Sequence, residues 1–224
     1  MRITQWIEIL GFTKQQIDEY LNSISKNDPK LLDELRHYVA LNPPIHAAMY
    51  IPLNAIIVRE VYKERHNSGC VNPSTMTQLY TAFSFTLLIR YLNDQRHWPW
   101  IKKLDRFEDL PTTVNKKFRT LCKLAFEGIS NNQQLIFSDL PNDFETLGFM
   151  QSVSESHISR GVSVSYNFLH LTIQEFLAAY HLSLQPEKVQ RDSILTATQV
   201  ELEGTGVTRI CSLSQPQLVL LQTF

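Results

Sequence analysis

The residue best suited to chemistry by type and position is His170, in the segment "YNFLHLTIQEFLAAYHL" at 166–182. Alternation before the histidine predicts a strand, and helical spacing of apolar residues after it predicts a helix that begins at or just after position 170. The amide dipoles of a helix N-terminus favour an anion, so an imidazole there can assist anion binding. A histidine at a strand-to-helix joint can equally be an ordinary residue with its hydrogen bonds satisfied locally.

No other pattern in the sequence predicts catalysis or a metal centre. The sequence contains no G-x-x-x-x-G-K-[ST] phosphate loop, no G-x-S-x-G nucleophile elbow and no H-E-x-x-H pair. The seven histidines lack metal-ligand spacing, and Cys70, Cys122 and Cys211 form no C-x-x-C pair. We therefore expect no catalytic residue and no metal ligand in this chain, and we expect the thiols to be reduced.

Charge and hydropathy exclude several classes of partner. The 21 Lys and Arg residues nearly balance 22 Asp and Glu residues, which leaves a formal net charge of −1 and no basic field for nucleic acid or an anionic membrane. The first residues lack the layout of a signal peptide, and the longest apolar stretch is interrupted by Pro52 and Asn54. We expect a cytoplasmic protein that contacts no membrane.

The first half of the chain predicts a helical bundle. Helical periodicity covers 13–24, 28–42, 52–62 and 75–94, with a polar loop at 63–74. Thr13 with Gln16 forms a capping-box pattern, and Asp28 followed by Pro29 is typical of a helix start. The prolines that follow Asn42 are expected to end the second helix.

The second half predicts a winged helix. A helix at 112–129 is followed by a short extended piece, helical turns at 142–148, two alternating segments typical of a hairpin, and the helix after His170. In that last helix Gln174 and Glu175 are expected to face solvent. The fold class predicted is mainly α, with a helical bundle before a boundary near residue 100 and a winged-helix domain with a small β-hairpin after it. The acidic segment "NDFETLG" disfavours the DNA binding that winged helices often perform.

Three segments resemble NACHT-type NTPases, the nucleotide switches of NOD-like receptors (NLRs). "FLHLTIQEFLAAYHL" resembles the segment that closes their winged-helix domain, "NPPIHAAMYIPLNAIIV" resembles their helical domain, and "IEILGFTKQQIDEYL" resembles the junction into it. The resemblance implies a remnant of the last nucleotide-domain strand at 1–11, a helical domain at 12–98 and a winged-helix domain at 99–185. The tail at 186–224 lacks a leucine-rich repeat pattern and receives no assignment.

The resemblance also implies a binding role for two residues. In the family, ADP lies between the nucleotide-binding sheet, the helical domain and the winged helix. Pro52 matches the proline that packs on the adenine, and His170 matches the histidine that hydrogen-bonds the terminal phosphate. Without the resemblance, Pro52 is an ordinary helix-starting proline. The phosphate loop and magnesium-binding acids of the family are absent, so ADP or ATP is implied for the full-length family protein and no cofactor for the isolated chain.

Two functions are compatible with these residues. The first is a non-catalytic regulatory fragment of an NLR-like, innate-immune signalling switch, which helps to hold ADP and the closed state when a P-loop domain is present. Its partners would be its own upstream nucleotide-binding domain and further copies on activation. The alternative is a helical and winged-helix adaptor that binds a protein, and less readily DNA, without nucleotide.

Overall fold

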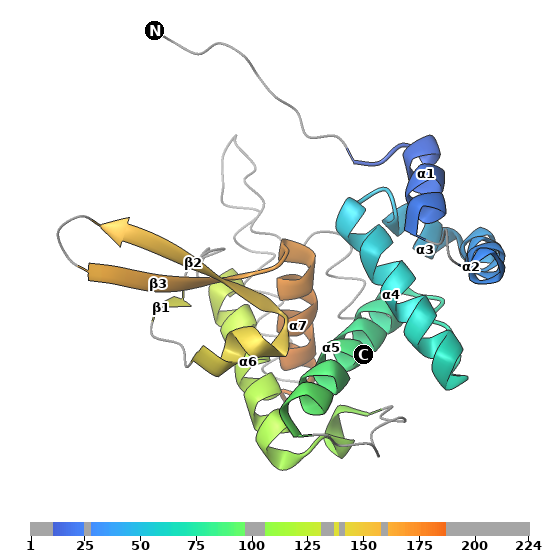
Figure 1. Cartoon of the computed structure of the whole chain (residues 1–224). Coiled ribbons are helices and arrows are strands. Elements are labelled where there is room, and N and C mark those ends of the chain that lie inside the picture. Colours follow the sequence, from blue (N-terminus) through green and yellow to red (C-terminus); the bar gives the residue numbers. More distant parts are fainter. Residues whose placement is uncertain are drawn as a thin grey trace, which may run out of the picture. The chain divides into compact units, whose positions relative to one another are not determined.

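The computed structural model describes residues 11–24, 28–96, 106–130, 137–138, 142–157 and 161–186 (Figure 1). Helices dominate these residues, and the main β element is an antiparallel hairpin, so the mainly α fold class with a small hairpin is confirmed. The chain divides into two compact units, Met1–Phe83 and Ser84–Phe224. The domain boundary near residue 100 stays a prediction, and it lies outside the described residues, as do residues 1–10 of the expected strand remnant at 1–11 and the tail from 187.

The first two helices begin where their capping residues predict. At α1 (Lys14–Ile24), the Thr13 amide donates to Gln16 Oε1 at 2.8 Å, and the Gln16 amide donates to Thr13 Oγ1 at 3.2 Å. These two bonds are the reciprocal pair of a capping box. At α2 (Pro29–Leu41), Asp28 Oδ1 accepts the Leu31 amide at 3.0 Å. Local chemistry therefore fixes both starts.

The next part of the first unit differs from the sequence prediction in two places. The prolines after Asn42 end α2 as expected, but they also start the short helix α3 (Pro43–Ala48), because proline is well tolerated in a first helical turn. The helix α4 (Pro52–Ser68) runs six residues into the predicted polar loop. It ends at Gly69, whose φ of 67° is the left-handed conformation typical of a helix C-terminus.

The second unit is built around two neighbouring helices, α6 (Thr112–Ser130) and α7 (Leu171–Ser183), which lie side by side (Figure 1). The unit also contains the C-terminal part of α5 (Met76–Arg96) and the short 3-10 helix η1 (Phe107–Asp109). The apolar stripe predicted for α6 is buried as expected: Val114, Phe118, Leu121, Cys122 and Ala125.

An aromatic cluster joins these elements. The Phe107 ring of η1 stacks on Phe85 of α5 at 4.3 Å between centroids and on Phe118 of α6 at 4.7 Å. Tyr180 of α7 lies 4.7 Å from Phe107 and 5.7 Å from Phe118. Such aromatic contacts add stability beyond that expected from the buried apolar area alone. The cluster therefore fixes η1 and the end of α7 against α6.

The described strands form a three-stranded antiparallel sheet in the order β1-β3-β2. The strands are β1 (Phe137–Ser138), β2 (Met150–His157) and β3 (Gly161–Phe168), and the 3-10 helix η2 (Asn142–Leu147) precedes β2. The hairpin register pairs Met150 with Phe168 and His157 with Gly161. The hairpin and the helices around it were predicted, whereas the pairing of β1 with β3 was not. The winged-helix assignment stays a prediction.

Candidate functional site

Hydrogen bonds fix the backbone on both sides of His170, where a strand is followed by a helix. Before it, the Leu169 amide donates to the Phe149 carbonyl at 3.0 Å, which continues the pairing of the hairpin. After it, α7 begins at Leu171, and His170 is its N-cap residue with extended backbone angles (φ −161°, ψ 151°). The predicted start of the last helix is thus confirmed, and the histidine lies at the positive end of the helix dipole.

The ring of His170 caps the helix through one nitrogen. Nδ1 accepts the Thr172 amide at 3.2 Å and lies 2.9 Å from the Thr172 hydroxyl oxygen. The Thr172 hydroxyl can donate to Nδ1 or accept from it, so this shorter contact fits either tautomer. In the tautomer in which Nδ1 accepts the amide, the proton of the neutral imidazole lies on Nε2, which can act as a donor. A partly exposed imidazole with this tautomer can donate to an anion while it continues to cap the helix.

Two apolar residues flank the histidine at the surface. Leu169 and Leu171 are each 41% exposed, on either side of the partly exposed His170. Exposed leucines beside a polar cap add apolar surface that a bound partner or ligand would cover.

The structure contradicts the prediction made for Gln174. It was expected to face solvent, but it is buried, and its Nε2 has no hydrogen-bond partner among the described residues. The reason is that α7 is buried on almost all sides, so a side chain one turn after His170 cannot reach water. Glu175 is partly exposed.

Pro52 lies in the first unit, as the first residue of α4. The residue before it, Ile51, has extended angles (φ −89°, ψ 119°) and provides no side-chain cap. Proline suits this position because the first helical residue needs no amide donor. Pro52 itself is exposed, and so are its apolar neighbours Tyr50, Ile51 and Ile56. The proline ring therefore lies in an exposed apolar patch, which can accept one face of a flat ring.

A close backbone contact anchors the turn before Pro52. The Phe12 amide donates to the Tyr50 carbonyl at 2.7 Å, and a Cβ added at Gly11 would collide with that same carbonyl oxygen. Only glycine allows this approach. Pro52 and His170 belong to different compact units.

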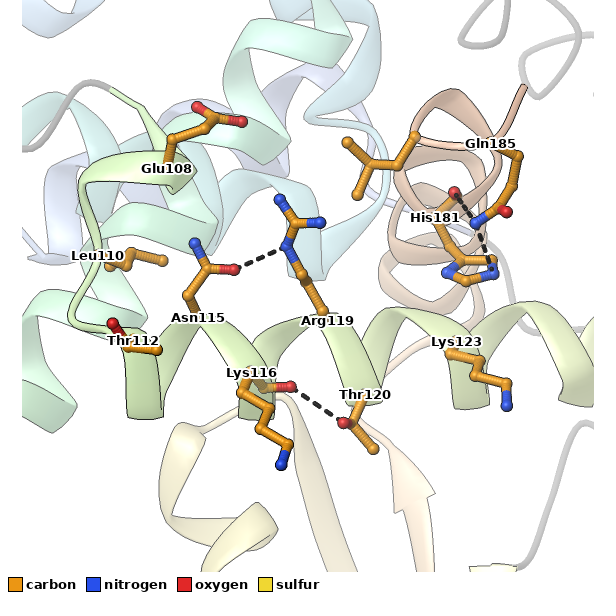
Figure 2. Close-up of a pocket in the computed structure, with 11 residues that line it drawn as sticks. Glu108, Leu110, Thr112, Asn115, Lys116, Arg119, Thr120, Lys123, His181 and Gln185 are labelled. Carbon is orange, nitrogen blue, oxygen red and sulfur yellow. Dashed lines mark hydrogen bonds between the residues drawn. The ribbon is translucent and has the colours of Figure 1, made fainter. Parts of the chain in front are cut away.

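The second unit also contains a pocket that sequence reasoning missed (Figure 2). The basic pocket, as we call it, has a volume of about 680 Å³ and is lined by η1, by α6 between Thr112 and Lys123, and by the C-terminal end of α7. Its cations are Lys116, Arg119 and Lys123, all on α6. Their spacing of three and four residues, on the face opposite the apolar stripe, is visible in the sequence. It is also the ordinary spacing of a solvated helix face.

One histidine lies at the edge of the basic pocket. His181 of α7 packs against the Phe126 ring at 5.4 Å between centroids. Burial lowers the pKa of His181 from its usual value of 6.5, and the nearby Lys123 lowers it further while Glu127 raises it. The ring is therefore mainly neutral at neutral pH.

Within the described residues, no group of acidic, histidine or cysteine side chains could hold a metal ion. No helix in the same part of the chain is long and apolar enough to cross a bilayer.

Comparison with known proteins confirms the resemblance to NACHT-type proteins of the NLR class, to which this chain is similar over most of its length. No family model matches. The chain is 25% identical over 198 residues to NACHT, LRR and PYD domains-containing protein 3 of Macaca mulatta, a match that covers 84% of the chain and 17% of that protein. It is 24% identical over 183 residues to Nucleotide-binding oligomerization domain-containing protein 2 of Hylobates lar, covering 79% of the chain and 17% of that protein. The chain therefore spans about a sixth of the length of these curated relatives.

Proposed function

We propose that this chain is a non-catalytic regulatory part of an NLR-like, innate-immune signalling switch, and that it helps to hold ADP and the closed state when a P-loop domain is joined to it. Similarity to NACHT-containing proteins over most of the chain supports the class. The sequence has no phosphate loop of its own, so the cradle for the phosphates has to come from another segment.

The observation that carries the nucleotide role is the cap that His170 forms at the start of α7. Nδ1 accepts the Thr172 amide, and in that tautomer Nε2 is a donor on the N-cap residue of the helix. Both the donor and the helix dipole favour a phosphate oxygen at this place. A hydrogen bond to a charged group contributes about 1.5–3 kcal/mol, which corresponds to roughly ten- to a hundredfold in affinity.

The apolar patch around Pro52 supports a second contact. Adenine is flat and apolar on its faces, and the exposed ring of Pro52 with Tyr50 and Ile51 offers a surface of the same kind. Removal of the proline ring removes only part of this surface. We therefore propose a smaller contribution from Pro52 than from His170.

As part of such a switch, the chain would contact its own nucleotide-binding domain in the closed state and further copies of the protein on activation. Both contacts would be made in the cytoplasm. We propose residues 12–98 as the helical domain and residues 99–185 as the winged-helix domain of this switch.

The test is ADP dissociation from a protein in which a P-loop domain precedes this chain. His170→Ala and His170→Ser both remove the Nε2 donor, but serine is also a good N-cap residue and keeps the start of α7. We expect both variants to release ADP about ten- to a hundredfold faster than the unchanged protein, and Pro52→Ala to have a smaller effect.

Thermal unfolding of each variant controls for loss of the fold. Unchanged ADP release from a folded His170→Ser variant would mean that the imidazole only caps α7. Failure of every form to retain ADP would favour the nucleotide-free adaptor.

A further inference from the structure

We propose that the basic pocket binds an acidic peptide segment of a protein partner. The pocket belongs to the second unit alone, and its residues are separate from His170 and Pro52. The proposal therefore does not depend on nucleotide binding.

The guanidinium of Arg119 is positioned by a neighbouring amide. Asn115 Nδ2 donates to the Phe107 carbonyl at 2.7 Å, and Asn115 Oδ1 accepts Arg119 Nε at 2.8 Å. The amide of Asn115 thus joins η1 to α6 and is fixed in orientation. Within the part of the chain that the structure describes, only Nε of Arg119 is used, so its two terminal nitrogens can bind a planar carboxylate.

The charge around this guanidinium is predominantly positive. Lys116 and Arg119 make no ion pair with a carboxylate in the described part of the chain, whereas Lys123 lies 3.4 Å from Glu127. Among the described residues that line the pocket, Glu108 of η1 is the only one with a carboxylate. The formal net charge of the whole chain is −1, so the chain as a whole does not attract polyanions. The excess of cations is local to this pocket, and an anionic partner that fits the pocket would complement it.

The arrangement of the cations favours a partner that carries several carboxylates along a helix. Figure 2 shows the Arg119 side chain directed toward Glu108, and the Lys116 and Lys123 side chains directed away from it, all from the exposed face of α6. The lysines are seven residues apart, which is about 10 Å along a helix. The three cations do not converge on one point as a single phosphate requires. Carboxylates spaced three and four residues apart on a helical peptide match them better, because they lie on one face with the same spacing.

Apolar surface beside the cations points to a peptide as well. Leu184, at the end of α7, lines the pocket and is 38% exposed. A peptide that carries an apolar side chain next to its carboxylates can cover this leucine, and a small free anion cannot.

The experiment measures binding of two labelled peptides to the full 224-residue chain by fluorescence anisotropy. The first peptide carries glutamates spaced three and four residues apart beside a leucine, and the second has glutamine in their place. At about 150 mM salt we expect the glutamate peptide to bind at least tenfold more tightly than the glutamine peptide.

Charge variants locate the site. Arg119→Glu should weaken binding of the glutamate peptide at least tenfold, and Arg119→Lys should weaken it less, because lysine keeps the charge without the planar fork. The matched control is Lys63→Glu, which makes the same change in net charge at an exposed position of the first unit. It should change the affinity less than about twofold.

Each remaining outcome overturns the proposal. Equal weakening by Lys63→Glu and Arg119→Glu would mean general charge attraction, and equal binding of the two peptides would mean that carboxylates are not recognised. Displacement of the peptide by inorganic phosphate, but not by sodium chloride of equal ionic strength, would make the pocket a small-anion site. If Arg119→Glu unfolds the chain, Arg119→Lys and Lys116→Gln decide between these outcomes.

Discussion

The capping bond of His170 predicts how two substitutions at this position differ in stability. His170→Ala removes the acceptor of the Thr172 amide, whereas His170→Ser supplies a hydroxyl oxygen that can accept the same amide. Loss of an N-cap costs about 0.5–2 kcal/mol. Because both His170 and Thr172 are partly exposed, water can replace some of the lost bond. We therefore expect about 1 kcal/mol for alanine and less than half of that for serine.

Two measurements can detect this difference in stability between the alanine and serine variants. In thermal unfolding, about 1 kcal/mol corresponds to a lower midpoint by roughly 2–4 °C in a chain of this size. Amide hydrogen exchange gives a local readout: the Thr172 amide should exchange faster in His170→Ala and remain protected in His170→Ser.

The prediction is refuted if all three proteins unfold at the same temperature and exchange the Thr172 amide at the same rate. Nδ1 would then not be the capping acceptor, and the tautomer with its proton on Nε2 would lose its support. The proposed phosphate contact would lose its principal support with it.

Four further outcomes are expected. Gly11→Ala should destabilise the first unit by about 1–3 kcal/mol in chemical unfolding, because the new Cβ meets the Tyr50 carbonyl; an unchanged unfolding midpoint would contradict that contact. Burial lowers the pKa of His181, so the unfolded chain binds more protons near and below its usual value of 6.5, and the free energy of unfolding should fall as the pH falls through that range. His181→Gln should reduce this loss between about pH 7.5 and 5.5, measured by thermal unfolding at both values, and an identical pH dependence would argue against the lowered pKa. The purified chain should hydrolyse no ATP above background, and a rate that copurifies with the chain and is lost on His170→Ala would overturn this. Limited proteolysis should cut first at about 95–110 or beyond 185, and early cleavage within 116–128 would contradict the predicted domains.

Most element starts follow from the sequence because their causes are local. Thr13 caps its helix with Gln16 and Asp28 caps the next one, through bonds that span three residues. The stripe of α6 is buried as its spacing predicts, since a helix can hide only one face against one neighbour. The position of His170 at the start of α7 follows from the change of hydrophobic period at that residue.

Other features depend on contacts between residues far apart in the chain, so the sequence alone could not predict them. Gln174 is buried because α7 is covered on nearly all sides, which its own periodicity does not reveal. The basic pocket requires η1 and the end of α7 beside α6. The stacking of Phe107 on Phe118 holds η1 against α6, and the contacts of Tyr180 with both rings hold α7 there.

The same distinction between local effects and long-range contacts applies to the two candidate sites. The sequence by itself determined that a histidine lies where a strand becomes a helix, because hydrophobic period and capping are short-range effects. Only the tertiary structure decided which ring nitrogen accepts the Thr172 amide and which elements lie beside the exposed cations of α6 to form a pocket. The physical reason is that the orientation of a side chain depends on what packs beside it, and packing partners are chosen by the whole fold.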